Sequence, residues 1–163
     1  MFRAPETTMS PTLLRWIFNL WPPFAASGIH VTGISRDWRH ARVELRMRAW
    51  NRNYVRTHYG GNLFSMTDPF WMIMTLQSLG RDYIVWDQAG SIEFVAPGRG
   101  TVWAEFRIRA EQLEAVRRAT AGGQKASPWY EVEIKALDGS LVARVKKQIY
   151  VRVKEQARAT APR

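Results

Sequence analysis

One carboxylate is set apart by its neighbours along the chain. Asp68 is the only charged residue between Asn62 and Leu79, a stretch that is otherwise largely apolar. Burying an ionised carboxylate is costly, so Asp68 needs a partner or a water-lined site. A carboxylate in such a setting is a candidate general base or nucleophile. Asp followed by proline, here Pro69, is also a good start for a helix, and the residues alone leave both interpretations open.

Two adjacent glycines, Gly60 and Gly61, stand just before this stretch. Glycine lets a ligand approach the backbone closely, and the N–H groups at the start of a helix can stabilise an oxyanion. An ordinary flexible turn would use the same two residues. The glycine pair alone does not decide between a catalytic loop and a plain turn.

The pattern of apolar residues predicts the elements that must hold these groups in place. A helix is expected from Ser10 to Trp21, capped by Ser10 and ended by Pro22-Pro23. Residues 62–79 are apolar on all sides of a helical wheel, which predicts a buried helix that Pro69 kinks or interrupts. Alternation of apolar and polar residues predicts strands. We expect them at 29–36, 41–48, 84–95 (interrupted near Gly90), 101–109, 130–136 and 141–153, with a short helix at 111–121.

This order of elements predicts an α+β fold. A single, nearly all-apolar helix must be buried on most of its sides. A curved antiparallel sheet of about six strands wrapped round the helix is the simplest structure that does this. Lys147 breaks the apolar face of the last strand, which suggests a bulge or a sheet edge. A chain of 163 residues and 18.9 kDa fits one domain. We expect that domain over 10–153, with disordered tails at 1–9 and 154–163.

Composition excludes several kinds of chemistry. The chain has no cysteine, which rules out disulfides, a thiolate nucleophile and zinc sites that need Cys. The three histidines, His30, His40 and His58, are scattered, and no metal site is expected. No Gly-x-Ser-x-Gly motif marks a nucleophilic serine. The net charge of +10 predicts an anionic partner, such as a nucleic acid, a membrane surface or a phosphate-bearing small molecule.

No targeting segment is expected. The apolar stretch from Leu13 to Trp21 contains Arg15 and Asn19, whereas a signal peptide has a cleaner apolar centre. No run of about 20 apolar residues predicts a membrane span. We therefore expect a cytoplasmic protein.

The residues from 53 to 68 carry a resemblance to a known family. They read Asn-Tyr-Val-Arg-Thr-His-Tyr-Gly-Gly-Asn-Leu-Phe-Ser-Met-Thr-Asp. This stretch resembles the hotdog-fold acyl-CoA thioesterases of the phenylacetate-pathway type, in which Asn-Gly and His-Gly-Gly precede a helix that carries Asp. Asn53, Gly60, Gly61 and Asp68 match that motif, while Tyr59 stands at the position of its His. Within that superfamily the chain looks closest to the uncharacterised DUF4442-like branch.

The resemblance implies a single hotdog domain with an extra N-terminal helix, and an acyl-CoA thioesterase activity. Asp68 would activate a water or attack the thioester directly. The backbone N–H of Gly61 would polarise the thioester carbonyl, and Asn53 would hold the water or the carbonyl. The residues implied to bind substrate are His58, Tyr59, Gly60, Phe64, Ser65 and Arg99.

The same resemblance implies the partners. The substrate would be an acyl thioester of coenzyme A or of an acyl carrier, with no cofactor beyond the coenzyme A of the substrate. The site would lie between two subunits, so we expect a homodimer or a dimer of dimers (homotetramer). Arg99, in the turn at 97–100, could contact a phosphate of coenzyme A, although a solvated surface arginine would look the same.

Three alternatives remain open from the residues. A non-catalytic protein that binds acyl-CoA or an acyl carrier would share the pocket without the chemistry. The N-terminal helix could dock on a membrane surface or pack on the sheet. Nucleic-acid binding is the less expected alternative, because no recognised RNA-binding motif appears. Its support is a basic run with two interleaved tryptophans: Arg36, Trp38, Arg39, Arg42, Arg46, Arg48, Trp50, Arg52 and Arg56.

Overall fold

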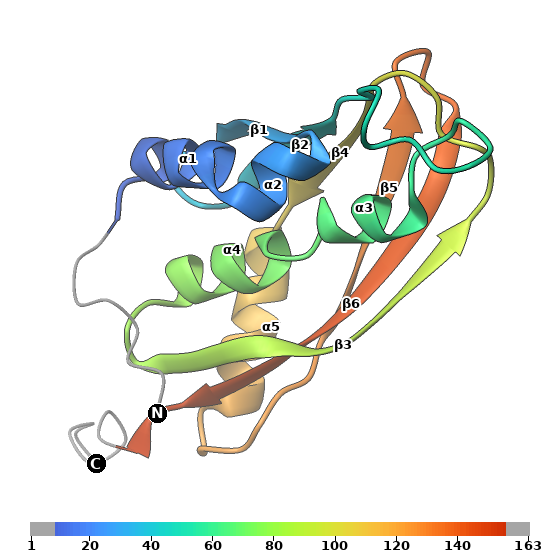
Figure 1. The fold of residues 1–163 in the computed structure, drawn as a ribbon. Coiled ribbons are helices and arrows are strands. Elements are labelled where there is room, and N and C mark those ends of the chain that lie inside the picture. Colours follow the sequence, from blue (N-terminus) through green and yellow to red (C-terminus); the bar gives the residue numbers. More distant parts are fainter. Residues whose placement is uncertain (1–8, 156–163) are drawn as a thin grey trace.

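A computed structural model describes residues 9–155 and has one six-stranded antiparallel sheet (Figure 1). The strand order in the sheet is β1-β2-β4-β5-β6-β3. The strands are β1 (Ile29–Ile34), β2 (His40–Leu45), β3 (Tyr83–Phe94), β4 (Val102–Arg107), β5 (Trp129–Ala136) and β6 (Leu141–Val153). The predicted α+β class and the strand number are confirmed. The predicted tails, 1–9 and 154–163, lie outside the described residues except for positions 9, 154 and 155.

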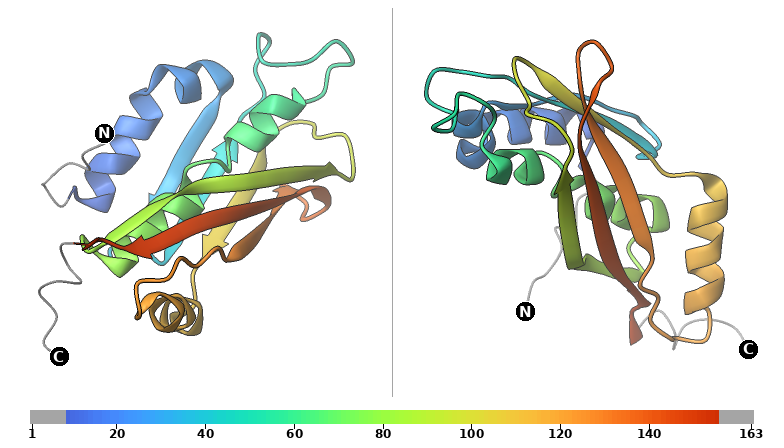
Figure 2. Two further views of the ribbon diagram at one scale, coloured as in Figure 1. Left: turned by 90° about the horizontal axis from the view of Figure 1, so that it is seen from below. Right: turned by 90° about the vertical axis from the view of Figure 1, so that its right-hand side faces the viewer.

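Five helices complete the described part of the chain. They are α1 (Pro11–Leu20), α2 (Pro22–Ser27), α3 (Gly60–Ser65), α4 (Phe70–Leu79) and α5 (Ala110–Thr120). The sheet curves around α4, as the two views of Figure 2 show. α5 packs beside the end of α4, where Nη2 of Arg117 donates a hydrogen bond to the carbonyl of Ser78. Within residues 9–155, no helix is both long enough and apolar enough to cross a membrane.

The central helical segment is interrupted where Pro69 stands. α3 ends at Ser65 and α4 begins at Phe70, with a turn over 66–69 between them. Proline has no N–H for a helical hydrogen bond, so the helix cannot run through it unbroken. The first turn of α4 has no side-chain cap, and Asp68 therefore does not cap it. The side chain of Asp68 is free for another contact, described below.

The core lies between the inner face of the sheet and α4. The alternation expected in the second strand is confirmed, because Ala41, Val43 and Leu45 are fully buried. Across the core, the ring of Phe106 on β4 stacks on Phe70 of α4 with centroids 4.7 Å apart. Burial of these side chains is the main source of stabilisation in a domain of this size.

The N-terminal helix packs on the edge of the sheet. Ser10 caps α1 by accepting a hydrogen bond from the N–H of Leu13, as predicted. Asn19 makes two hydrogen bonds to the backbone of Val31 on the edge strand β1. Pro22-Pro23 ends α1 and also begins α2, a short helix that the sequence pattern did not indicate. Of the two placements considered for this helix, packing against the sheet is the observed one.

The strand that contains Lys147 lies inside the sheet. β6 pairs with β5 on one side and with β3 on the other, so the expectation of a sheet edge at Lys147 is wrong. The register is irregular at two places. One lies in β3, between Asp87 and Ala89, and the other lies in β6 itself, where Leu141 pairs with Lys135 and Ala143 with Ile134, so that Val142 is the extra residue. A bulge is therefore present in the last strand, but it is not at Lys147. β3 runs unbroken past Gly90.

Candidate functional site

Asp68 is held by a lysine from the far end of the chain. The Nζ of Lys147 donates a hydrogen bond of 2.6 Å to Oδ1 of Asp68. The same Nζ lies 3.2 Å from Oδ2 of Asp87 on β3. One ammonium therefore joins the turn between α3 and α4 to two neighbouring strands of the sheet.

The three side chains differ in exposure. The side chain of Lys147 is only 4% exposed, that of Asp87 is 27% exposed and that of Asp68 is 56% exposed. The ammonium also lies 5.5 Å from the centroid of the Phe64 ring of α3. A buried cation needs anionic partners and a polarisable wall, and these groups supply both.

Asp87 is in a different setting from Asp68. Burial raises the pKa of the Asp87 carboxyl above its usual value, and Lys147 counteracts part of that effect. Its Oδ1 is buried and has no hydrogen-bond partner among the described residues. The carboxyl of Asp87 is thus the inner partner of Lys147, and Asp68 is the one that faces solvent.

The loop before α3 is ordered by Asn53. Its Oδ1 accepts a hydrogen bond from the N–H of Thr57, and its Nδ2 donates to Oγ1 of Thr57 and to the carbonyl of His58. Asn and Asp side chains often fold turns in this way. Asn53 is therefore a structural residue of the loop in addition to whatever it does for a ligand.

His58 closes the base of this loop. It is 3% exposed, and its Nε2 donates a hydrogen bond of 2.7 Å to the carbonyl of Gly100. That bond assigns the proton to Nε2 and leaves Nδ1 as an acceptor, which is buried without a partner in the described residues. Burial lowers the pKa of His58 below its usual value. The ring is therefore neutral at physiological pH.

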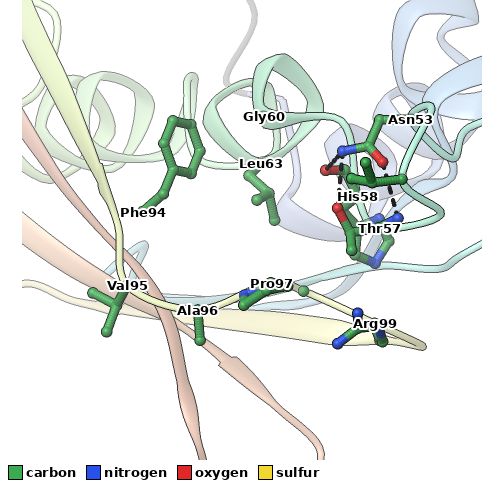
Figure 3. Close-up of a pocket in the computed structure, with 12 residues that line it drawn as sticks. Asn53, Thr57, His58, Gly60, Leu63, Phe94, Val95, Ala96, Pro97 and Arg99 are labelled. Atoms are coloured by element: carbon green, nitrogen blue, oxygen red, sulfur yellow. Dashed lines mark hydrogen bonds between the residues drawn. The ribbon is translucent and has the colours of Figure 1, made fainter.

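A pocket of about 490 Å³ opens between this loop, α3 and the end of β3 (Figure 3). Asn53, His58 and Gly60 line one side, and Arg99 lies at the exposed end of the other. The remaining wall is mostly apolar: Val55, Thr57, Leu63, Phe94, Val95, Ala96, Pro97 and Gly98. An apolar pocket with a few polar groups is the usual form of a small-molecule site.

The structure divides the predicted site residues into two groups. Asn53, His58, Gly60 and Arg99 line the pocket. The other group does not line it: Tyr59, Gly61, Phe64, Ser65 and Asp68. In the single chain, Asp68 and the pocket are therefore separate parts of the candidate site.

Tyr59 and Gly61 touch each other at the start of α3. A Cβ added at Gly61 would lie 2.9 Å from Cζ of the Tyr59 ring, so the ring rests against the glycine backbone. Gly61 is the second residue of α3, and N–H groups in the first turn of a helix have no acceptor within the helix. Similarly, a Cβ at Gly60 would lie 2.8 Å from Cζ of Phe94. A side chain at either position would meet the far end of one of these exposed rings, which would have to move.

Sequence reasoning missed Lys147 and Asp87 as members of the site. The signal for Lys147 was present, since it breaks the apolar face of the last strand. A lysine that faces the core requires a counter-charge. Asp68, the only charged residue in its own apolar segment, was the corresponding anion. Asp87 carried no comparable signal, because a single Asp in a strand is also found on solvated faces.

Part of the predicted basic run packs on the outer face of the sheet. The guanidinium of Arg42 lies 4.2 Å from the centroid of the Trp103 ring, and Arg46 pairs with Glu44 at 3.0 Å. Such contacts are typical of a solvated sheet face. These two arginines are thus engaged with the protein itself.

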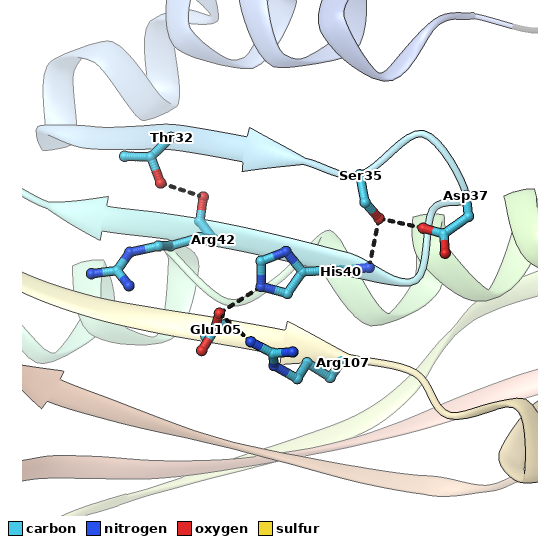
Figure 4. Close-up of polar contacts among 7 residues, drawn as sticks. All are labelled: Thr32, Ser35, Asp37, His40, Arg42, Glu105 and Arg107. Carbon is cyan, nitrogen blue, oxygen red and sulfur yellow. Dashed lines mark hydrogen bonds and ion pairs between the residues drawn. The ribbon is translucent and has the colours of Figure 1, made fainter.

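A second ion-pair group lies on the same face, across β2 and β4 (Figure 4). Oε1 of Glu105 lies 2.6 Å from Nε2 of His40 and 2.9 Å from Nη2 of Arg107. The hydrogen bond from His40, together with Arg107, lowers the pKa of Glu105. Across residues 9–155, no group of three or more His, Asp or Glu side chains is placed to hold a metal ion.

Solved structures share this fold. A Pseudomonas aeruginosa protein of unknown function, called a probable thioesterase, matches with a TM-score of 0.79 and 19% identity, over 92% of this chain and 100% of its own. A thioesterase from Haemophilus influenzae matches with a TM-score of 0.66 and 11% identity, over 91% and 94%. The E. coli PaaI protein of the phenylacetic acid degradation operon matches with a TM-score of 0.59 and 20% identity, over 86% and 91%. At these identities the likeness establishes the fold.

The predicted hotdog fold is confirmed by these neighbours and by the sheet curved around α4. No curated protein matches the chain by sequence. A family model, however, covers nearly all of the described residues: the domain of unknown function DUF4442 matches residues 11–151. The chain belongs to the DUF4442 family of hotdog-fold proteins.

Proposed function

We propose that this protein hydrolyses acyl thioesters and that Asp68 is its general base or nucleophile. The observation that carries the proposal is the placement of Asp68: an accessible carboxylate, fixed by a buried ammonium, in the turn that follows the Gly60-Gly61 helix start. The hotdog neighbours called thioesterase or probable thioesterase support this choice of reaction.

The proposed chemistry needs one base and one group to stabilise an oxyanion. Asp68 takes a proton from water, and the resulting hydroxide adds to the thioester carbonyl carbon. The N–H of Gly61 stabilises the oxygen that becomes negative. The C–S bond then breaks, the thiolate recovers the proton from Asp68, and the products are a carboxylic acid and a free thiol. In direct attack, Asp68 would form an anhydride that water then hydrolyses.

The pocket beside the loop is proposed to bind part of the substrate. Its apolar wall suits an acyl chain or the pantetheine arm of coenzyme A. The exposed Arg99 at its rim suits a phosphate of the nucleotide. The His58 ring and the amide of Asn53 are polar groups on the opposite wall.

The assembly is proposed to be a homodimer, with pairing of two such dimers as a further step. β3 lies at the edge of the sheet and pairs only with β6 among the described strands. A twelve-residue edge strand offers a row of backbone groups to a second chain. A dimer would also allow Asp68 of one subunit to face the pocket of the other. A cytoplasmic location stays a prediction.

The direct test is a panel of acyl-CoA thioesters, short and long, aliphatic and aromatic, read by release of free thiol. The wild-type protein should hydrolyse at least one of them, and Asp68→Asn should hydrolyse it far more slowly. Asp82→Asn is the matched control, because Asp82 is an exposed aspartate at the other end of the α4 segment. An acyl-carrier thioester in the same panel distinguishes the two carriers.

A second function is favoured by one observation. Asp68 is paired with Lys147 and does not line the pocket of its own subunit, as expected if the carboxylate only supports the fold. The protein would then bind acyl-CoA without cleaving it. In that case calorimetry would detect acyl-CoA binding by the wild type while no thioester in the panel is hydrolysed.

A further inference from the structure

Lys147 is buried while its main partner is not. The Lys147 side chain is 4% exposed and the Asp68 side chain is 56% exposed. Exposed ion pairs contribute little to stability, and replacing a whole buried ion pair by apolar residues is often neutral for stability, whereas removing only one partner is destabilising. The desolvation of Lys147 is therefore poorly explained by folding alone.

The position of the ammonium is fixed from three directions. Oδ1 of Asp68 lies at 2.6 Å, Oδ2 of Asp87 at 3.2 Å and the Phe64 ring centroid at 5.5 Å. β6 is an inner strand held on both sides, whereas Asp68 sits in the turn between two helices. Lys147 on the inner strand β6 thus fixes Asp68, which lies in an irregular turn. Support of a reactive group from a rigid element is the usual way to keep that group in place.

The charges around Lys147 are also unbalanced. Two carboxylates share one ammonium, and on the third side Tyr130 of β5 stands opposite Lys147 in register. Tyr130 is buried, and burial raises the pKa of its hydroxyl, which keeps it neutral. Tyr130 therefore adds no charge here, and Lys147 is the cation that contacts Asp68.

We infer that Lys147 is a positioning residue for thioester hydrolysis: its ammonium orients the carboxylate of Asp68 through Oδ1, while Asp87 anchors the ammonium from within. This inference rests on the proposed function. The contact engages one oxygen of Asp68, and the exposure of the side chain leaves the carboxylate accessible to substrate.

The test compares Lys147→Met with Lys147→Arg on the thioester that the wild type hydrolyses best. Lys147→Met should lower kcat by about ten- to a hundredfold, the usual effect of removing a group that orients a reactive one. KM should change much less. Lys147→Arg keeps the positive charge and should recover most of the lost kcat.

A second variant keeps the test informative if Lys147→Met fails to fold. Lys147→Met leaves Asp87 buried without its cation, whereas Lys147→Met with Asp87→Asn removes that charge and should restore the melting temperature. If the folded double variant keeps the wild-type kcat, Lys147 is structural and the inference is overturned. Loss of activity in Asp68→Asn with no effect of Lys147→Met overturns only the inference. A wild type that hydrolyses no thioester overturns both proposals.

Discussion

The Nζ of Lys147 lies 2.6 Å from Oδ1 of Asp68, although 79 residues separate the two along the chain. The contact joins an inner strand of the sheet to the turn that interrupts the central helix. It explains how a charged residue is tolerated in each of two apolar segments, since each charge compensates the other. The same contact gives Asp68 a fixed place beside the start of α4.

The aromatic contact between sheet and central helix should dominate stability. Phe106 is fully buried, stacks on Phe70 and meets the edge of the Trp71 ring at 5.2 Å. Phe106→Ala should lower the free energy of unfolding by about 3–5 kcal/mol, as measured by chemical denaturation. Leu137→Ala, at a position that is 71% exposed, should change it by less than about 0.5 kcal/mol. Equal effects of the two substitutions would contradict this description of the core.

The loop at 53–58 should depend on the Asn53 side chain. Asn53→Ala removes two donated hydrogen bonds and one accepted one, which should cost about 1–3 kcal/mol. The loss of these hydrogen bonds should appear as faster hydrogen exchange of the Thr57 amide in the variant than in the wild type. Asn53→Asp keeps the acceptor for Thr57 N–H and should have an intermediate effect. Unchanged Thr57 protection together with lost hydrolysis would show that Asn53 acts on the substrate and not on the loop.

Burial of His58 should make stability depend on pH. Burial lowers the pKa of His58 from its ordinary value of 6.5, so the unfolded chain binds a proton at a higher pH than the folded one. The stabilisation is complete above that ordinary value and is lost as the pH falls through the lowered pKa. His58→Gln can still donate to the Gly100 carbonyl but does not titrate.

The measurement is the free energy of unfolding of both proteins between about pH 5 and pH 8. The wild-type curve should fall relative to the His58→Gln curve as the pH is lowered. His30 titrates in both proteins and cancels in the comparison. Two parallel curves would mean that His58 does not titrate differently in the folded and unfolded chains.

The exposed edge of β3 predicts self-association. The large side chains of Trp86 and Phe94 on this strand are 51% and 57% exposed in the single chain. Sedimentation or light scattering should give a mass twice the 18.9 kDa of the chain, or a multiple of that dimer. A monomer at micromolar concentration would contradict the proposal of a site shared by two subunits.

Local sequence patterns were sufficient for most of the fold. The alternation through Ala41, Val43 and Leu45 identifies β2 because strands have a period of two residues. Ser10 identifies the start of α1, because its side chain caps the helix. Each of these patterns depends on residues close together in the sequence, so it can be recognised without knowledge of the rest of the chain.

The parts that could not be predicted depend on distant segments. The pairing of Lys147 with Asp68 requires the sheet order, which places β6 inside the sheet, and no local pattern encodes that order. The pocket likewise forms only where the loop before α3 meets the end of β3. The resemblance over residues 53–68 indicated candidate site residues, but it covered neither Lys147 nor Asp87.

The central claim is that Asp68 makes this protein a thioester hydrolase. The measurement that tests it most directly is free-thiol release from the acyl-CoA panel by the wild type, Asp68→Asn and the control Asp82→Asn, all checked for folding by circular dichroism. We predict hydrolysis by the wild type and the control, and a rate lower by about 10²–10⁴-fold in Asp68→Asn, the usual contribution of a general base. Equal rates in a folded Asp68→Asn variant, or no hydrolysis of any thioester by the wild type, would contradict the claim.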